Sequence, residues 1–373
     1  MRRFGVYIHF PWCRNRCPYC DFAIAIAGEG GIPHEAYLEC VLAELDQHAG
    51  RFAGGTLVSI YFGGGTPSLW SQQCLARVVA RVREVFTEQS EVLEVTLEAN
   101  PTDCTDEGMA GWLGAGINRL SIGVQSTRAD ELVTLGRDHS MGDGIAALES
   151  ALSAGFQTLS ADVIVGTPGG QAGIESVETV SALEPPHLSV YELTIEQRTP
   201  MAAAVRRGEM TPRDDDELAA IYTETHHELE ARGYEHYEIS SYAKPGHRAV
   251  HNSLYWSGRE FLGLGNGAAS FAITAEGGER WTNHRAVGRY MGAPSGYWVG
   301  QSDTLTPLAM VIDRIWLGLR TLDGVSEVAF EGRDQLLEWL LSERLAVHDE
   351  KRIRPTLRGF LYADEVARRT VAL

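Results

Sequence analysis

The chain has 373 residues, of which 44% are hydrophobic and 22% are charged, and this composition excludes a disordered or fibrous protein. Its 50 acidic and 32 basic residues give a formal net charge of −18, which argues against general binding to nucleic acid or anionic lipid. No apolar stretch reaches the roughly 18 to 20 residues that cross a bilayer, and no signal-peptide pattern opens the chain. We therefore expect a cytoplasmic protein with no transmembrane segment and no nucleic-acid partner.

Short apolar runs alternate with helical periods along the first part of the chain. Helices are predicted over residues 33–49, after Ser71, and over residues 214–233, where acidic residues open the helix and a glycine ends it. The predicted strands are residues 5–10, 57–62, 93–97, 119–124, 159–165 and 188–193. Strands that alternate with helices in this way indicate a parallel sheet joined by right-handed crossovers.

Polar residues or glycine-rich turns stand at the ends of several of these strands. They are His9, the turn Gly63-Gly64-Gly65-Thr66, Glu98, Gln125, Asp162 and Glu192. A barrel gathers the carboxyl ends of its strands at one face, where active sites lie. A doubly wound sheet is the competing architecture. We favour an α/β fold in which residues 1–240 form a partial (β/α)6 barrel.

A second region begins after about Tyr242, where the sequence becomes rich in glycine and aromatic residues. Helices are predicted from Thr306 onward and over residues 334–341, and a short hairpin and a last helix are predicted within residues 345–370. We expect residues 241–373 to form a smaller accessory α+β domain of winged-helix type.

All six cysteines lie at or before residue 104, and three of them follow the first strand as Cys13-x-x-x-Cys17-x-x-Cys20. Three thiolates on one short loop can bind three irons of a [4Fe–4S] cluster and leave the fourth iron open for a ligand. A zinc ion with His9 or Asp21 as its fourth ligand is the competing interpretation. The remaining three are interpreted as small buried hydrophobic residues: Cys40, Cys74 and Cys104.

This cysteine spacing, with Tyr19 before Cys20, resembles that of the radical S-adenosylmethionine (SAM) superfamily. The segments YIHFPWC at residues 7–13 and CPYCDF at residues 17–22 narrow the resemblance to one branch, which holds the oxygen-independent coproporphyrinogen III oxidases and the HemW-type haem chaperones. The resemblance covers nearly the whole chain. It implies that the open iron takes the amino and carboxylate groups of SAM and that an electron from the cluster cleaves the cofactor to a 5′-deoxyadenosyl radical.

The same resemblance implies a set of SAM contacts along the predicted barrel. The glycine-rich turn is expected near the methionine amino group, Arg137 near the cofactor carboxylate and Asp162 near the ribose hydroxyls. The full set of expected contacts is Tyr7, Gly64, Gly65, Thr66, Glu98, Gln125, Arg137 and Asp162.

A second motif, His251-Asn-Ser-Leu-Tyr255-Trp256, resembles the HNxxYW motif of HemW-type haem chaperones. An imidazole is a common axial ligand of haem iron, and the aromatic side chains offer flat apolar surface for the macrocycle. The resemblance therefore makes His251 the expected haem ligand, although a histidine among aromatic residues is usually just packed and hydrogen-bonded.

Two departures from the oxidases favour the chaperone. Phe22 stands where the oxidases carry a further cysteine, and twelve residues precede Cys13 in place of their longer N-terminal arm. We expect a HemW-type chaperone that binds a [4Fe–4S] cluster, SAM and haem and passes haem to a recipient protein, with an unidentified electron donor. The alternative is an oxygen-independent coproporphyrinogen III oxidase, which decarboxylates two propionates in porphyrin biosynthesis. Another radical SAM enzyme, such as a methyltransferase, and a zinc protein are weaker alternatives.

Overall fold

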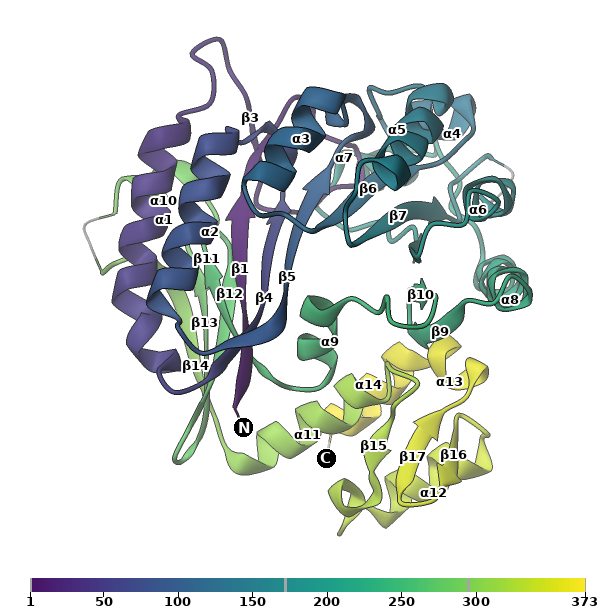
Figure 1. Ribbon diagram of the computed structural model, residues 1–373. Coiled ribbons are helices and arrows are strands. Elements are labelled where there is room, and N and C mark those ends of the chain that lie inside the picture. Colours follow the sequence, from purple (N-terminus) through teal and green to yellow (C-terminus); the bar gives the residue numbers. More distant parts are fainter. Residues whose placement is uncertain (1, 171–172, 294–295, 373) are drawn as a thin grey trace.

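The computed structural model describes residues 2–170, 173–293 and 296–372. In these residues the main element is a twelve-stranded sheet with the order β14-β13-β12-β11-β1-β4-β5-β6-β7-β8-β10-β9 (Figure 1). Its last two strands, β10 (Ser241–Ala243) and β9 (Glu235–Glu238), are antiparallel to their neighbours. Six neighbouring strands are parallel. They are β1 (Arg3–Phe10), β4 (Thr56–Gly64), β5 (Gln89–Ala99), β6 (Arg119–Gln125), β7 (Thr158–Val165) and β8 (His187–Glu192). The six predicted parallel strands are thus confirmed, each within a few residues of its expected bounds.

Helices cover the outer face of these strands, and Figure 1 shows the sheet curving around the short helix α9 (Val250–Trp256). The other helices of this region are α1 (His34–His48), α2 (Gln72–Val85), α3 (Asp106–Gly114), α4 (Ala129–Thr134), α5 (Met141–Ser153), α6 (Ile174–Ser181), α7 (Pro200–Arg206) and α8 (Asp215–Ala231). Local signals set two of the predicted helix starts. The Ser71 hydroxyl accepts a hydrogen bond from the backbone of α2, and Asp214 and Glu217 form a capping box on α8.

The two faces of the parallel sheet differ in polarity. On β1, the side chains of Phe4, Val6 and Ile8 are fully buried in the main hydrophobic core, together with apolar residues of α1 and α2. Successive side chains of a strand point to opposite faces, so Tyr7 and His9 lie on the other face, inside the curve of the sheet. Polar side chains of the strands therefore collect on this inner face.

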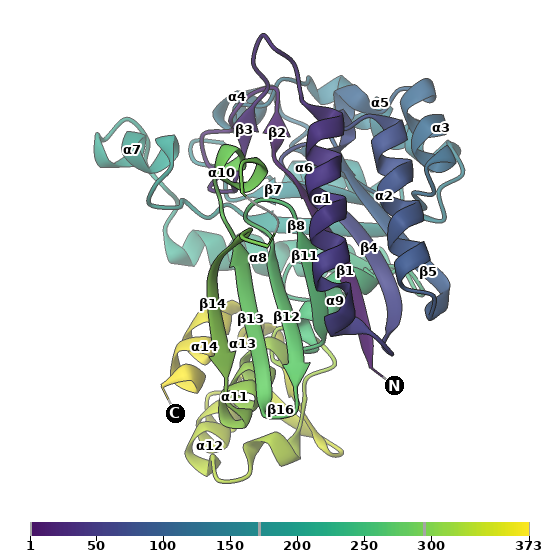
Figure 2. The ribbon, with the colours of Figure 1, turned by 90° about the vertical axis from the view of Figure 1, so that its left-hand side faces the viewer.

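Four further strands extend the sheet beyond β1 (Figure 2). The first of them, β11 (Glu260–Leu264), pairs with β1 in parallel, and β12 (Ala269–Thr274), β13 (Gly277–Asn283) and β14 (Val299–Leu305) follow as antiparallel neighbours. Helix α10 (Val287–Met291) joins the last two. The large sheet thus crosses the boundary predicted at residue 240, and the division into residues 1–240 and 241–373 stays a prediction.

The last residues form a separate hydrophobic core around Ile315, Phe330, Leu336 and Ile353. Its elements are α11 (Pro307–Gly318), β15 (Val325–Ser326), α12 (Asp334–Ser342), β16 (Ala346–Asp349), β17 (Arg352–Pro355), α13 (Leu357–Leu361) and α14 (Ala363–Val371). The order helix, strand, helix, hairpin is the one expected of a winged-helix unit. None of the helices in the described residues combines the length and the apolar character that crossing a membrane requires.

Candidate functional site

Cys13 lies at the start of a loop whose two ends are joined by strand pairing, and Cys17 and Cys20 lie within that loop. Strand β2 (Trp12–Cys13) pairs in parallel with β3 (Ala25–Ile26), so residues 14–24 project as one loop from the end of β1. Within the loop, the backbone N–H of Cys20 donates a hydrogen bond to the carbonyl of Cys17 at 3.2 Å. All three cysteines are free thiols, and all three line a cavity of about 380 Å³.

The cavity lies at the carboxyl ends of the parallel strands, where the sequence predicts the site. Most of the predicted cofactor contacts line it together with the cysteines: Gly64, Gly65, Thr66, Glu98, Gln125, Arg137 and Asp162. Tyr7 and His251 are not among its lining residues. Asn100 and Tyr191 line it as well, and the sequence pattern alone does not single them out, although Asn100 belongs to the segment that follows the third strand.

The carboxylate of Glu98 is held at the end of β5 by two donors. The Tyr61 hydroxyl donates to one oxygen at 2.8 Å, and the backbone N–H of Gly64 donates to the other at 3.1 Å. Burial raises the pKa of Glu98 to about 7. The side chain therefore stands at the cavity wall as a buried acid that a neighbouring cation would ionise.

Asp162 is a second buried carboxylate at the cavity, and it lies within β7, three residues before that strand ends. Its two oxygens accept hydrogen bonds from the hydroxyls of Ser121, at 2.7 Å, and Ser160, at 2.8 Å. Burial raises the pKa of Asp162. Serine donors on neighbouring strands thus fix the orientation of a carboxylate that lines the cavity.

The guanidinium of Arg137 joins the cysteine loop to the strand ends. One nitrogen lies 3.7 Å from the Cys17 sulfur, and another donates to the Asn100 side chain at 2.7 Å. Its buried Nε has no hydrogen-bond partner within the described residues. The preceding Gly136 has a φ of +63°, and a Cβ there would lie 2.6 Å from the Pro18 ring, so glycine lets the loop approach Arg137.

Two further backbone features shape the cavity wall. A Cβ on Gly65 would lie 2.6 Å from the carbonyl oxygen of Pro11, so only glycine fits beside the cysteine loop. Gln125, at the end of β6, has a φ of +64°, an uncommon conformation for a residue with a side chain. Strained residues of this kind collect at functional sites.

The thiols lie in surroundings that suit a metal centre. Burial raises the pKa of Cys13 to about 11, although a hydrogen bond with Thr66 and the nearby Arg137 partly oppose this rise. Burial also raises the pKa of Cys20. Buried thiols ionise when a metal coordinates them. Together with the unpartnered Nε of Arg137 and the glycine-lined wall, this chemistry fits an iron–sulfur cluster with a polar ligand beside it.

The same geometry disfavours a single zinc ion. Sulfurs bound to one tetrahedral zinc lie about 3.8 Å apart. Among the described residues, the only three potential metal ligands whose atoms all lie within 4.8 Å of one another are His226, His227 and Glu230, so the three sulfurs are spread more widely. The two residues expected as a fourth zinc ligand, His9 and Asp21, both contact other groups. His9 lies between the Tyr7 hydroxyl and the Ala23 carbonyl, at 3.1 Å from each, and Asp21 faces Arg285.

Tyr7 and His251 lie deeper inside the curve of the sheet. The ring of Tyr7 lies 6.1 Å from that of Tyr61 and 6.3 Å from that of His251. The imidazole of His251 is 1% exposed, with Nδ1 at 2.8 Å from the Ser59 hydroxyl and Nε2 at 2.7 Å from the Tyr255 hydroxyl. Burial lowers the pKa of His251 to about 3. In this conformation both ring nitrogens are hydrogen-bonded, and the histidine does not border the cysteine cavity.

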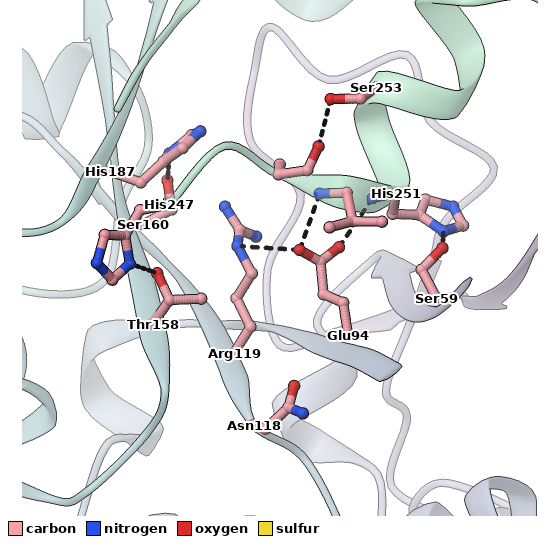
Figure 3. Close-up of polar contacts among 12 residues, drawn as sticks. Ser59, Glu94, Asn118, Arg119, Thr158, Ser160, His187, His247, His251 and Ser253 are labelled. Carbon is pink, nitrogen blue, oxygen red and sulfur yellow. Dashed lines mark hydrogen bonds and ion pairs between the residues drawn. The ribbon is translucent and has the colours of Figure 1, made fainter. Parts of the chain in front are cut away.

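Helix α9, which carries His251, is anchored inside the sheet by a buried carboxylate (Figure 3). Glu94 on β5 accepts hydrogen bonds from the backbone N–H groups of Val250, at 2.9 Å, and His251, at 2.8 Å. Arg119 on β6 is 2% exposed and lies 3.9 Å from the same carboxylate. The sequence does not predict this pair, because only the fold brings Glu94 and Arg119 together beside the start of α9.

Comparison with known proteins places the chain in a family. The profile of the radical SAM superfamily matches residues 7–172. The heme chaperone HemW of Mycobacterium tuberculosis is 34% identical over 371 residues, which cover 98% of this chain and 94% of the relative. That of Escherichia coli is 38% identical over 267 residues, covering 71% of this chain and 69% of the relative.

A solved structure shares the fold. The coproporphyrinogen III oxidase HemN from Escherichia coli superposes with a TM-score of 0.80 over 99% of this chain and 90% of that chain, at 22% sequence identity. At this identity the likeness concerns the architecture alone. The sequence relatives are closer in identity, and they decide between the two branches. The chain belongs to the HemW family within the radical SAM superfamily.

Proposed function

We propose that the chain is a haem chaperone that holds a [4Fe–4S] cluster and SAM in the cysteine cavity and transfers haem to a recipient protein. The observation that carries the proposal is the cavity, in which three free thiols face the polar strand ends of the parallel sheet. Relatives named heme chaperones over nearly the full chain support the haem assignment. Membership of the radical SAM superfamily supports the cluster and SAM.

In this proposal, Cys13, Cys17 and Cys20 ligate the cluster, and the surrounding strand ends bind SAM. The chemistry that a cluster held by these thiolates would supply is an electron for reductive cleavage of SAM. Arg137 would pair with the cofactor carboxylate, because a guanidinium can bind a carboxylate through two hydrogen bonds. Glu98 would hold the amino group, since a nearby cation keeps its carboxylate ionised. We assign Gly64, Gly65, Thr66 and Gln125, which line the cavity, to the same cofactor. The proposed contact of Tyr7 needs the cofactor to extend beyond the lining residues of this cavity.

Asp162→Asn is expected to weaken SAM binding about tenfold, because the charged acceptor for the ribose hydroxyls is lost while the shape of the side chain is kept. The measurement is calorimetric titration of anaerobically reconstituted protein with SAM. Asp323→Asn is the matched control, because that exposed carboxylate lies outside the cavity and pairs with Arg248 at the surface. An unchanged affinity of the Asp162 variant would remove this residue from the cofactor site.

Haem binding through His251 needs a local rearrangement. Its Nε2 can reach iron only if the Tyr255 hydroxyl, now 2.7 Å away, leaves it. Both residues lie on the short helix α9, so a shift of that helix or a rotation of Tyr255 would free the ligand atom. We therefore propose His251 as a haem ligand in a second conformation of α9.

His251→Ala is expected to weaken haem binding about tenfold or more while the iron content of the cluster stays unchanged. Haem titration of the reconstituted protein measures the affinity. His187→Ala is the matched control, because His187 is also buried with both nitrogens bonded, to Ser160 and Tyr237 at 2.8 Å each. Equal haem affinity in wild type and His251→Ala would exclude His251 as a ligand.

An anaerobic turnover assay separates the chaperone from the oxidase. The reconstituted protein is given SAM, a reductant and coproporphyrinogen III, and the oxidised porphyrins are separated by chromatography. A chaperone forms no protoporphyrinogen IX under conditions in which cluster and SAM are bound. Formation of this product over several turnovers would contradict the proposed function.

A further inference from the structure

A second cluster of metal-ligating side chains lies on α8, outside the cysteine cavity. His226, His227 and Glu230 each offer one ligand atom, and the three atoms lie within 4.8 Å of one another. The His226 Nε2 lies 3.7 Å from a carboxylate oxygen of Glu230. Residues three and four apart on a helix are neighbours, so both histidines can reach Glu230. Two imidazoles and a carboxylate are a ligand set that binds zinc and related divalent cations.

Hydrogen bonds orient the ring of His226 and fix its tautomer. Its Nδ1 lies 3.0 Å from the Nδ1 of His236, so one of these nitrogens donates to the other. The Nε2 of His236 lies 3.4 Å from the Ile239 carbonyl, which can only accept, and 3.3 Å from the Tyr222 hydroxyl, whose own proton goes to that carbonyl. His236 therefore carries a proton on Nε2.

The surroundings of His236 decide which ring donates between the two Nδ1 atoms. His236 is 7% exposed and stacks on Tyr242 with ring centroids 4.1 Å apart, and burial of this kind favours the neutral ring. A neutral His236 with its proton on Nε2 accepts on Nδ1. His226 consequently donates from its Nδ1 and keeps the lone pair of its Nε2 on the side of Glu230. A histidine that binds a metal is commonly held in this way, with its other ring N–H donated to a fixed acceptor.

We propose that His226, His227 and Glu230 form a binding site for one first-row divalent cation, for which Zn²⁺ is the probe. The His226 side chain is 18% exposed and that of Glu230 is 67% exposed, so the site is open to solvent. Three protein ligands leave at least one coordination position for water or a further ligand. The site is therefore expected to exchange its ion with solution.

The position of the site links two parts of the molecule. Figure 1 shows α8 beside β9 (Glu235–Glu238), the strand that carries His236, with α13 nearby. The ring of His236 also lies 5.0 Å from that of Phe360 on α13. His226 contacts His236, and His236 contacts Phe360 on α13. A metal ion bound to His226 would restrict the position of its ring, so metal binding should stabilise the packing of α8 against α13.

The test is a zinc titration of the full chain with its iron–sulfur cluster in place, measured by calorimetry and by metal analysis after equilibrium dialysis against micromolar zinc. Wild type is expected to bind one zinc ion per chain at micromolar zinc, and His226→Ala to lose this binding. His236→Phe keeps the stacked ring but removes the acceptor, and it is expected to weaken binding about tenfold. The melting temperature of wild type, and not of His226→Ala, should rise with zinc.

His348→Ala is the matched control, because His348 is an exposed histidine that pairs with Glu327 at 2.8 Å on another face. This variant should bind zinc as wild type does. Equal zinc binding by wild type and His226→Ala would overturn the proposal. Loss of iron in step with zinc uptake would overturn it as well, because the zinc would then occupy the cysteines.

Discussion

The Cys17→Ala variant is expected to lose the iron–sulfur cluster completely. Cys17 lies between the other two cysteines on the loop, and it is the thiol that the Arg137 guanidinium approaches, at 3.7 Å. Three protein ligands already leave one iron open, so a second iron without a ligand exposes the cluster to hydrolysis and loss. The measurement is iron and sulfide content, with the visible absorption of the cluster, after anaerobic reconstitution.

The chain offers a matched control for this substitution. Cys74 is fully buried on α2 and lies outside the cavity, so Cys74→Ala should keep a full cluster. Its effect should be limited to the modest destabilisation that follows the loss of a small buried side chain. A full complement of iron and sulfide in Cys17→Ala would show that the cluster ligands have been assigned wrongly.

The parallel part of the sheet could be predicted from the sequence because its signals are local. The strands are short segments rich in apolar residues, and Ser71 and Asp214 mark the starts of their helices by side chains that cap the adjacent backbone. The polar residues at the strand ends lie together at one cavity because parallel strands end at the same edge. Glu98 and Asp162, which are far apart in the chain, line the same cavity for this reason.

The features that the sequence did not predict depend on contacts between distant segments. Strand β11 pairs with β1, more than two hundred residues earlier, and no local pattern specifies that register. Glu94 stands in a strand that alternates polar and apolar residues, yet only the fold shows that its carboxylate receives α9. Only resemblance to a known motif singles out the sequence of α9, and it does not predict the bonds of His251 to Ser59 and Tyr255.

Glu94, Arg119 and Ser59 can be buried on the inner face of the sheet because each has a polar or charged partner there. Glu94 accepts two backbone N–H groups at the start of α9, where the helix dipole favours a negative charge. Arg119 supplies the opposite charge, and Ser59 bonds to the imidazole of the same helix (Figure 3). The buried polar groups thus fix the position of one short helix. Because that helix carries the proposed haem ligand, its anchoring and the proposed function are connected.

Glu94→Ala is expected to lower the free energy of unfolding by about 3 to 5 kcal/mol, because it leaves Arg119 as a buried charge with its close partner removed. The two N–H groups at the start of α9 also lose their acceptor. The measurement is urea unfolding followed by circular dichroism. Glu91→Ala is the matched control, because Glu91 is an exposed glutamate of the same strand and its loss should have little effect.

A double substitution separates the cost of the unpaired Arg119 charge from the cost of the lost hydrogen bonds at the start of α9. In Glu94→Ala/Arg119→Met the buried cation is gone as well, so this variant is expected to be more stable than Glu94→Ala alone. The loss of stability that remains in the double variant is then due to the missing hydrogen bonds at the start of α9. If Glu94→Ala costs less than about 1 kcal/mol, the pair does not hold α9 in place, and haem binding through His251 need not be coupled to the inner face of the sheet. If the double variant is no more stable than the single one, the penalty comes from the helix cap, and Arg119 finds other partners within the polar interior.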